Sequence, residues 1–332
     1  MKPLKSKNLD KHLLNTISYF SFFGYPPSLD EIHTFFPEKI TKNKLRILLQ
    51  SLVRQKIIFC HCEEVYPERV EGKQSQKRSP RSSSDSEDSL AMTRDCYNSI
   101  NGSLTSNDQR LTTNVSYTLP QYPTHFKNRA MRQSICQKKL IPVKCYTGIL
   151  EKFPFIRFIG ITGSASMGNT TPNDDVDIFI ITSKNCLFIG RFFAILFSYI
   201  FNVRKGKNSV CLNLFFDECN LVIPKHKQTP YVAHEILQMK PVVNKGHVYE
   251  RFLKANGWVF KIFPNAINDL SLSSRVPPLR EGIPFLSFLF FPFEFALKTL
   301  QLAIIRRNKT GLIISPTQLW LFKKDFEKKL TN

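Results

Sequence analysis

Acidic side chains are scarce in this chain. It has 26 Asp and Glu residues against 47 Lys and Arg residues, which gives a formal net charge of +21 at pH 7. No acid occurs between Asp108 and Glu151. Such an excess of positive charge attracts polyanions, so the composition favours a nucleic acid, a nucleotide or an anionic membrane surface as partner. A generally basic proteome or a basic tail is the alternative explanation of the charge.

Paired cysteine motifs are also missing. The chain has 8 cysteines and no CxxC spacing. Cys60 and Cys62 flank a histidine, but no second His/Cys pair completes a zinc site. We therefore expect buried or free thiols in a reducing cytoplasm. Residues 1–5 lack the apolar segment of a signal peptide, which agrees with a cytoplasmic location.

Two common phosphate-binding motifs are absent as well. The chain contains no GxxxxGK[ST] sequence and no GxGxxG after an expected strand. P-loop and Rossmann folds therefore have no support, and a nucleotide site needs another pattern.

Two apolar runs near the middle of the chain carry such a pattern. Residues 158–162 lead into Gly163 and Ser164, and the second run opens with Asp175 and Asp177. Side chains alternate along a strand, so the two aspartates share one face, about 7 Å apart, and suit a divalent cation such as Mg²⁺. Gly163 has no Cβ and lets the backbone approach a ligand. Ser164 begins a segment that can turn into a helix, whose free N–H groups would face an anion.

This pattern resembles the signature of the nucleotidyltransferase superfamily, which includes DNA polymerase β, the kanamycin nucleotidyltransferases and the small MNT proteins. That signature is hydrophobic-Gly-Ser, a spacer of about ten residues, then Asp-hydrophobic-Asp-hydrophobic. Here Gly163-Ser164, the spacer 165–174 and residues 175–178 match it. The Met-Gly-Asn sequence inside the spacer looks like a bacterial subgroup described only as nucleotidyltransferase-domain proteins.

The resemblance implies an enzyme that transfers a nucleoside monophosphate to an acceptor hydroxyl. The substrate would be ATP or another nucleoside triphosphate, with AMP the expected group, and the acceptor cannot be read from the sequence. Asp175 and Asp177 would hold Mg²⁺ or Mn²⁺, and Gly163 and Ser164 would hold the outer phosphates. The expected catalytic residues are thus Asp175, Asp177 and Ser164. The implied fold is α/β, a small mixed sheet with flanking helices similar to that of polymerase β.

The expected third strand, residues 210–216, departs from the family pattern. Active members place a third acid there, as a metal ligand or as a general base. Here Asn213 or a neighbour such as Leu212 holds the inward position, and a carboxamide cannot take a proton at neutral pH. Asp217 and Glu218, at the end of the strand, are the candidate replacements. The rival interpretation is a catalytically weak or inactive regulator that senses a nucleotide and binds DNA.

The N-terminal part of the chain resembles a winged helix-turn-helix. Apolar spacing predicts a helix over residues 9–23. Ser28 and Glu31 form a capping box for a second helix, and Thr41 caps a third. This third helix has an apolar stripe and a basic face, and a strand over 57–62 follows it, so it is the candidate DNA reader. A helical module that packs on the catalytic domain or on a protein partner is the alternative.

A chain of 332 residues is long enough for two or three domains. One polar, charged stretch predicts a disordered insertion at the tip of the wing hairpin, with an interdomain linker as the alternative. The predicted division is 1–65 for the first part of the winged-helix-like domain, 66–113 for the insertion, 114–150 for the wing strand and a connecting helix, 151–223 for the nucleotidyltransferase core and 224–332 for a C-terminal helical region.

Two segments are long and apolar. Residues 186–203 carry Arg191 as their only charge and predict a buried helix between two strands rather than a membrane span. Residues 283–305 include Glu294 and Lys298, and charges at a bilayer centre are costly. They predict a helix docked on the catalytic domain, with an interfacial membrane helix as the less favoured alternative.

Two further helical regions complete the prediction. Residues 124–150 predict a basic helix, with an interruption at Pro142 as an open possibility. It would steer ATP or present a solvated face. Residues 231–262 predict two helices, the first of which contains His234 and Glu235. These two side chains are candidates to face the nucleotide, although packing on the sheet is the more common role of such a pair.

Overall fold

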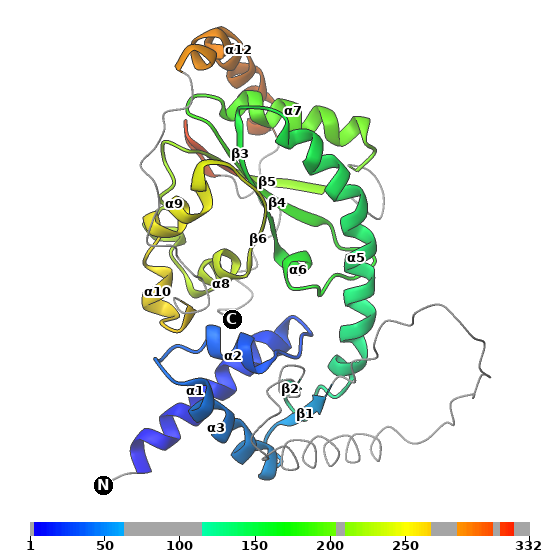
Figure 1. Cartoon of the computed structure of the whole chain (residues 1–332), viewed down its shortest axis with the longest axis vertical. Coiled ribbons are helices and arrows are strands. Elements are labelled where there is room, and N and C mark those ends of the chain that lie inside the picture. The colour runs from blue at the N-terminus through cyan, green and yellow to red at the C-terminus, as the bar shows by residue number, and fades with distance from the viewer. Residues whose placement is uncertain (1–2, 63–114, 204–209, 267–283, 308–312, 322–332) are drawn as a thin grey trace, which may run out of the picture. The chain divides into compact units, whose positions relative to one another are not determined.

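The computed structural model describes residues 3–62, 115–203, 210–266, 284–307 and 313–321 (Figure 1). The predicted disordered insertion, residues 66–113, lies outside these ranges. The chain divides into two compact units, Met1–Ala130 with Phe263–Asp269, and Met131–Ile262 with Leu270–Asn332.

The first unit contains the helices and the strand pair predicted for a winged-helix-like domain. Its elements are α1 (Pro3–Phe22), α2 (Leu29–Thr34), α3 (Lys42–Arg54), β1 (Phe59–Cys62) and β2 (Val115–Thr118). β1 and β2 pair antiparallel, so the predicted pairing of these two distant segments is confirmed. The predicted caps are confirmed too, because Ser28 and Glu31 form the capping box of α2 and Thr41 caps α3.

A short segment from the second half of the chain completes this unit. Asn265 is buried and accepts a hydrogen bond from the backbone N–H of Ile40, at 3.0 Å. Its side-chain amide donates to the carbonyls of Phe36 and Glu38, at 3.2 and 2.8 Å. One side chain thereby satisfies three backbone groups of the connection between α2 and α3. Nothing in the local sequence around Asn265 predicts this role.

The second unit is built on a mixed sheet. Its described strands lie in the order β6-β3-β4-β5-β8-β7. β3 (Ile156–Thr162) and β4 (Val176–Thr182) are antiparallel, and β5 (Val210–Asp217) is parallel to β4. α7 (Leu187–Ile200) connects the two parallel strands, as a parallel pair requires. The three predicted strands and this connecting helix are therefore confirmed.

The sheet is wider than the sequence predicted. β6 (Lys240–Asn244) pairs with β3 at a position where a turn between two helices was expected. β7 (Ile313–Ile314) and β8 (Gln318–Trp320) extend the other side, in a region predicted to be helical. These strands have two to five residues, too few for an alternating pattern to be recognised. β6 is also an edge strand, where Pro241 is tolerated because no further strand needs its missing N–H.

Helices cover both faces of the sheet. In Figure 1, α5 and α7 lie on one side and α8, α9 and α10 on the other. The bounds are α5 Thr124–Glu151, α6 Gly163–Ser166, α8 Pro230–Gln238, α9 Val248–Ala255, α10 Val259–Ile262 and α12 Pro284–Arg307, with short 3₁₀ turns at Lys225–Lys227 and Lys245–His247. α5 continues through Pro142 without interruption. None of the described helices has the length and apolar character needed to cross a membrane.

The two faces of the sheet have different side chains. The strand side chains on the side toward α5 and α7 are mainly aliphatic and include Ile156, Ile159 and Ile180. The opposite side is aromatic: the ring of Phe179 lies 5.8 Å from that of Phe158 and 5.1 Å from that of Phe216. Strand alternation explains the difference, because neighbouring residues of one strand point to opposite faces. Both faces are buried, so these strands have no polar alternation.

Candidate functional site

The two halves of the predicted motif meet at one end of β3 and β4. Thr162, the last residue of β3, pairs with Asp177 of β4, and Gly163 follows with a φ of +63°. A Cβ at Gly163 would lie 2.6 Å from Oδ2 of Asp177. A side chain at this position would therefore need a strained backbone and a displaced carboxylate. The group that lies close to the Gly163 backbone in this structure is thus the Asp177 carboxylate, and the expected approach of a ligand stays a prediction.

Asp177 is half-buried next to a second carboxylate. Burial, and then the charge of Asp175, raise the pKa of Asp177 to about 7. Asp175 itself is exposed and directly precedes β4. A nearby cation would favour the charged form of Asp177 and offset the repulsion between the two carboxylates.

Asn213 occupies the inward position of β5. Its side-chain amide donates a hydrogen bond to Oδ1 of Asp177, at 3.2 Å. Leu212, the alternative, is part of the aliphatic core. The carboxamide thus orients Asp177, and it adds no negative charge where the family pattern has a third acid.

A different third carboxylate reaches the site from α8. Oε2 of Glu235 accepts the backbone N–H of Gly163 at 3.0 Å, and Nε2 of Gln238 donates to its Oε1 at 2.7 Å. Burial raises the pKa of Glu235 to about 7, against the opposing effect of the Gly163 hydrogen bond. The N–H predicted to hold a phosphate is therefore occupied by a side chain of the protein. His234 is buried in the core, and burial lowers its pKa to about 3, so its ring is neutral.

Ser164 lies in α6, which has only four residues. Its carbonyl accepts the N–H of Asn169 at 2.9 Å, which closes the first turn of the spacer loop. Two basic side chains of α5 hold the rest of this loop: Arg132 donates to Oδ1 of Asn169 at 2.9 Å, and Lys139 donates to the carbonyls of Pro172 and Asp174. The basic character of α5 thus has a structural use that the sequence did not predict.

Asp217 and Glu218 are not part of this site. In the pairing of β4 with β5, Cys211 lies opposite Asp177 and Asp217 lies opposite Thr182. Six residues of strand separate the two positions, about 20 Å. The hypothesis that Asp217 or Glu218 replaces the third acid is therefore wrong, because β5 carries them to the opposite end of the sheet.

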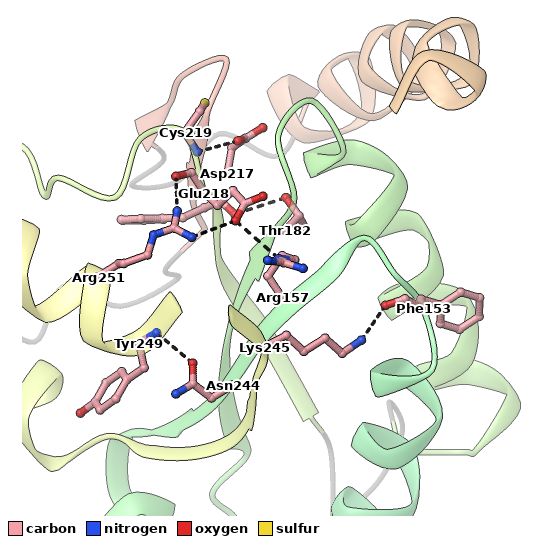
Figure 2. Close-up of polar contacts among 11 residues, drawn as sticks. Phe153, Arg157, Thr182, Asp217, Glu218, Cys219, Asn244, Lys245, Tyr249 and Arg251 are labelled. Carbon is pink, nitrogen blue, oxygen red and sulfur yellow. Dashed lines mark hydrogen bonds and ion pairs between the residues drawn. The ribbon is translucent and has the colours of Figure 1, made fainter. Parts of the chain in front are cut away.

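These two acids belong to a polar cluster that fixes the far end of the sheet (Figure 2). Asp217 accepts the N–H groups of Asn185 and Cys219, at 2.7 and 2.9 Å. Glu218 binds Arg157 and Arg251, with N–O distances of 3.5 and 3.3 Å. These bonds attach α9 to the strand ends, which is a structural role.

Two side chains of α9, those of Tyr249 and Arg251, also have structural roles. The ring of Tyr249 stacks on Phe158 with a centroid distance of 5.4 Å, and its backbone N–H is capped by Asn244 (Figure 2). Arg251 pairs with Glu218 in the cluster described above. Neither side chain lies at the Gly163 end of the sheet.

The two carboxylates of Asp175 and Asp177 suit Mg²⁺, which needs few protein ligands, better than a metal ion that protein side chains enclose. Within the described ranges, no three His, Cys, Asp or Glu side chains are grouped to hold a metal ion. Mg²⁺ is commonly bound by one or two carboxylates, with water and substrate phosphates as its other ligands. Asp175 and Asp177, two carboxylates at the start of one strand, fit that description.

No protein-family model matches this chain, and no curated protein or solved structure has significant similarity to it. The resemblance to nucleotidyltransferases therefore rests on the sequence motif. The winged-helix resemblance of the first unit rests on its helices, caps and strand pairing in the same way.

The conformation of Gly163 gives a first prediction. Gly163→Ala should lower the free energy of unfolding of the second unit by about 1–2 kcal/mol, because alanine is strained at positive φ and displaces Asp177. The matched control is Gly148→Ala in α5, where an added Cβ meets nothing within 4 Å. That variant should be neutral or more stable. Both tryptophans, Trp258 and Trp320, lie in the second unit, so urea unfolding followed by fluorescence measures it selectively. Equal effects of the two substitutions would contradict the prediction.

The raised pKa of Asp177 gives a second prediction. A carboxyl group with a higher pKa in the folded state stabilises the fold below its usual pKa of 3.8, and this contribution is lost as pH rises through about 7. Without divalent cations, the second unit should therefore be less stable at about pH 8 than at about pH 5. Asp177→Asn should reduce that difference by about 1–2 kcal/mol in the same unfolding assay. An unchanged pH dependence in this variant would show that Asp177 ionises normally.

Proposed function

We propose that this protein is a Mg²⁺-dependent nucleotidyltransferase that transfers a nucleoside monophosphate from ATP, or from another nucleoside triphosphate, to an acceptor hydroxyl. The observation that carries the proposal is the contact between Gly163 and Asp177. It joins the Gly-Ser turn and the Asp-Val-Asp strand of the motif at one end of two paired strands. The mixed sheet with helices on both faces is compatible with a polymerase β-like domain.

Each side chain of the site has a role in this proposal. Asp175 and Asp177 hold the cation, which when bound would offset the negative charge that develops on the transferred phosphoryl group. Asn213 keeps the Asp177 carboxylate oriented through its 3.2 Å hydrogen bond. The Ser164 hydroxyl and the Gly163 N–H bind the outer phosphates. The second of these contacts requires Glu235 to release the N–H that it accepts in this structure.

Calorimetric titration with ATP and Mg²⁺ tests the proposal directly. The wild-type protein should bind ATP only with Mg²⁺, and Asp175→Ala/Asp177→Ala should weaken binding at least about 100-fold, because both cation ligands are removed. Asp10→Ala in α1 is the control for loss of an acid elsewhere and should bind like wild type. Release of pyrophosphate, measured on the same samples with candidate acceptors, tests transfer. Equal binding by the wild type and the double variant would contradict the proposed site.

Glu235 gives a separate prediction about nucleotide affinity. Glu235→Gln keeps an oxygen that can accept the Gly163 N–H but removes the negative charge beside the phosphates. ATP should therefore bind about 10-fold more tightly to this variant, because the repulsion between carboxylate and phosphate is lost. Glu250→Gln in α9, where the native carboxylate accepts from Asn244, is the matched control. Weaker binding to Glu235→Gln would show that the carboxylate assists the nucleotide instead of excluding it.

A nucleotide-sensing regulator is the second candidate. The observation that favours it is Asn213, which stands where active relatives of the proposed family place an acid and which acts here as a hydrogen-bond donor. The helices and paired strands of the first unit are compatible with DNA binding through α3. In the titration above, this candidate predicts Mg²⁺-dependent ATP binding without pyrophosphate release from any acceptor.

A further inference from the structure

α12 packs on its own domain through Leu297, Leu302 and Ile305 together with two polar side chains, and it exposes large apolar side chains on the side that faces away. Its buried residues include Glu294 and Gln301. Its exposed residues include Phe293, Leu300 and Ile304, with exposed fractions of 65%, 59% and 53%. The three exposed positions are spaced by seven and four residues, which places them on one stripe of the helix. A surface helix of a water-soluble domain normally exposes polar and charged side chains on that face.

The two buried polar side chains of α12 attach the helix to α7. The two carboxylate oxygens of Glu294 accept the N–H groups of Phe188 and Ile189, both at 2.8 Å. These N–H groups lie in the first turn of α7, where the helix itself offers them no acceptor. The carboxylate therefore caps that helix and interacts favourably with its dipole. Gln301 donates to the carbonyl of Phe188 at 2.8 Å and accepts from Arg191 at 2.7 Å. This network fixes which side of α12 faces outward.

α7 continues the apolar surface. It exposes Phe192, Leu196, Tyr199 and Ile200, although its other side packs in the aliphatic core. In Figure 1, α12 lies on the outer side of α7. The two helices contain one acidic residue, Glu294, and it is buried. No carboxylate is therefore exposed on this pair of helices.

We infer that the apolar faces of α7 and α12 bind the surface of an anionic lipid bilayer, with α12 lying in the plane of the interface. Lipid accepts apolar side chains on a helix whose polar groups are satisfied within the protein. The formal net charge of +21 complements anionic headgroups, and the sequence of α12 ends in Arg306 and Arg307. A second copy of the chain carries the same +21 and would add like-charge repulsion. The inference does not depend on the proposed nucleotidyl transfer.

Vesicle co-sedimentation of the full-length protein tests the inference. The protein should bind vesicles of about equal parts phosphatidylcholine and phosphatidylglycerol at least about 10-fold more tightly than pure phosphatidylcholine vesicles. Phe293→Glu/Leu300→Glu should lower affinity for the mixed vesicles at least about 10-fold, since each substitution places a charge in the apolar stripe. The matched control is Phe22→Glu/Ile47→Glu, which changes two exposed apolar residues of the first unit, with exposed fractions of 52% and 66%. It lowers the net charge equally and should stay within about two-fold of wild type.

Three results would overturn the inference. The first is that the wild type does not bind the mixed vesicles, and the second is that the control variant loses as much affinity as the α12 variant. The third is that the wild type sediments as a dimer, which Phe293→Glu/Leu300→Glu separates into monomers. The last result would assign the face to a protein contact.

Leu300→Trp provides a variant that keeps the surface apolar. Its fluorescence should shift to the blue with the mixed vesicles, and that of Ile47→Trp should not.

Discussion

The contact between Gly163 and the Asp177 carboxylate is the constraint on which the candidate site depends. It brings the ends of β3 and β4 together, and only a residue without a side chain fits between them at positive φ. Around this point the protein gathers Asp175, Asn213 and Glu235 from three further positions in the sequence. The result is a group of three carboxylates, in which Asp177 and Glu235 are half-buried and have pKa values raised by burial. Such a group is unstable as a set of anions, and a cation or a proton relieves it.

The parts of the second unit outside this site have mainly structural roles. At the far end of the sheet, Glu218 and its two arginine partners attach α9 to the strands. At the loop that separates the two halves of the motif, Lys139 of α5 is buried and holds the backbone in place. Among these three polar groups of the described residues, the one around Asp177 combines like charges with a close backbone approach. Ion pairs and backbone hydrogen bonds satisfy the other two groups.

Much of the central fold could be predicted because it is encoded locally. The apolar runs of β3, β4 and β5, the capping box at Ser28 and the cap at Thr41 each depend on residues within a few positions of one another. Asp217 and Glu218 show the limit of this reasoning. Their chemistry suited a third acid, but the parallel pairing of β5 with β4 places them about 20 Å from Asp177. Likewise β6, β7 and β8 are too short to carry a pattern of their own, and pairing with longer strands defines them.

The sequence by itself determined the motif, its spacing, the central strands, the excess of positive charge and the apolar character of α7 and α12. Only the tertiary structure decided which groups meet. It placed Glu235 on the N–H of Gly163, although 72 positions separate them in the chain. It also brought Asn265 to the loop between α2 and α3 and turned Glu294 of α12 inward, so that the apolar stripe faces out. The physical reason is that local sequence fixes backbone conformation and periodicity, whereas contacts between distant residues depend on how strands pair and helices pack.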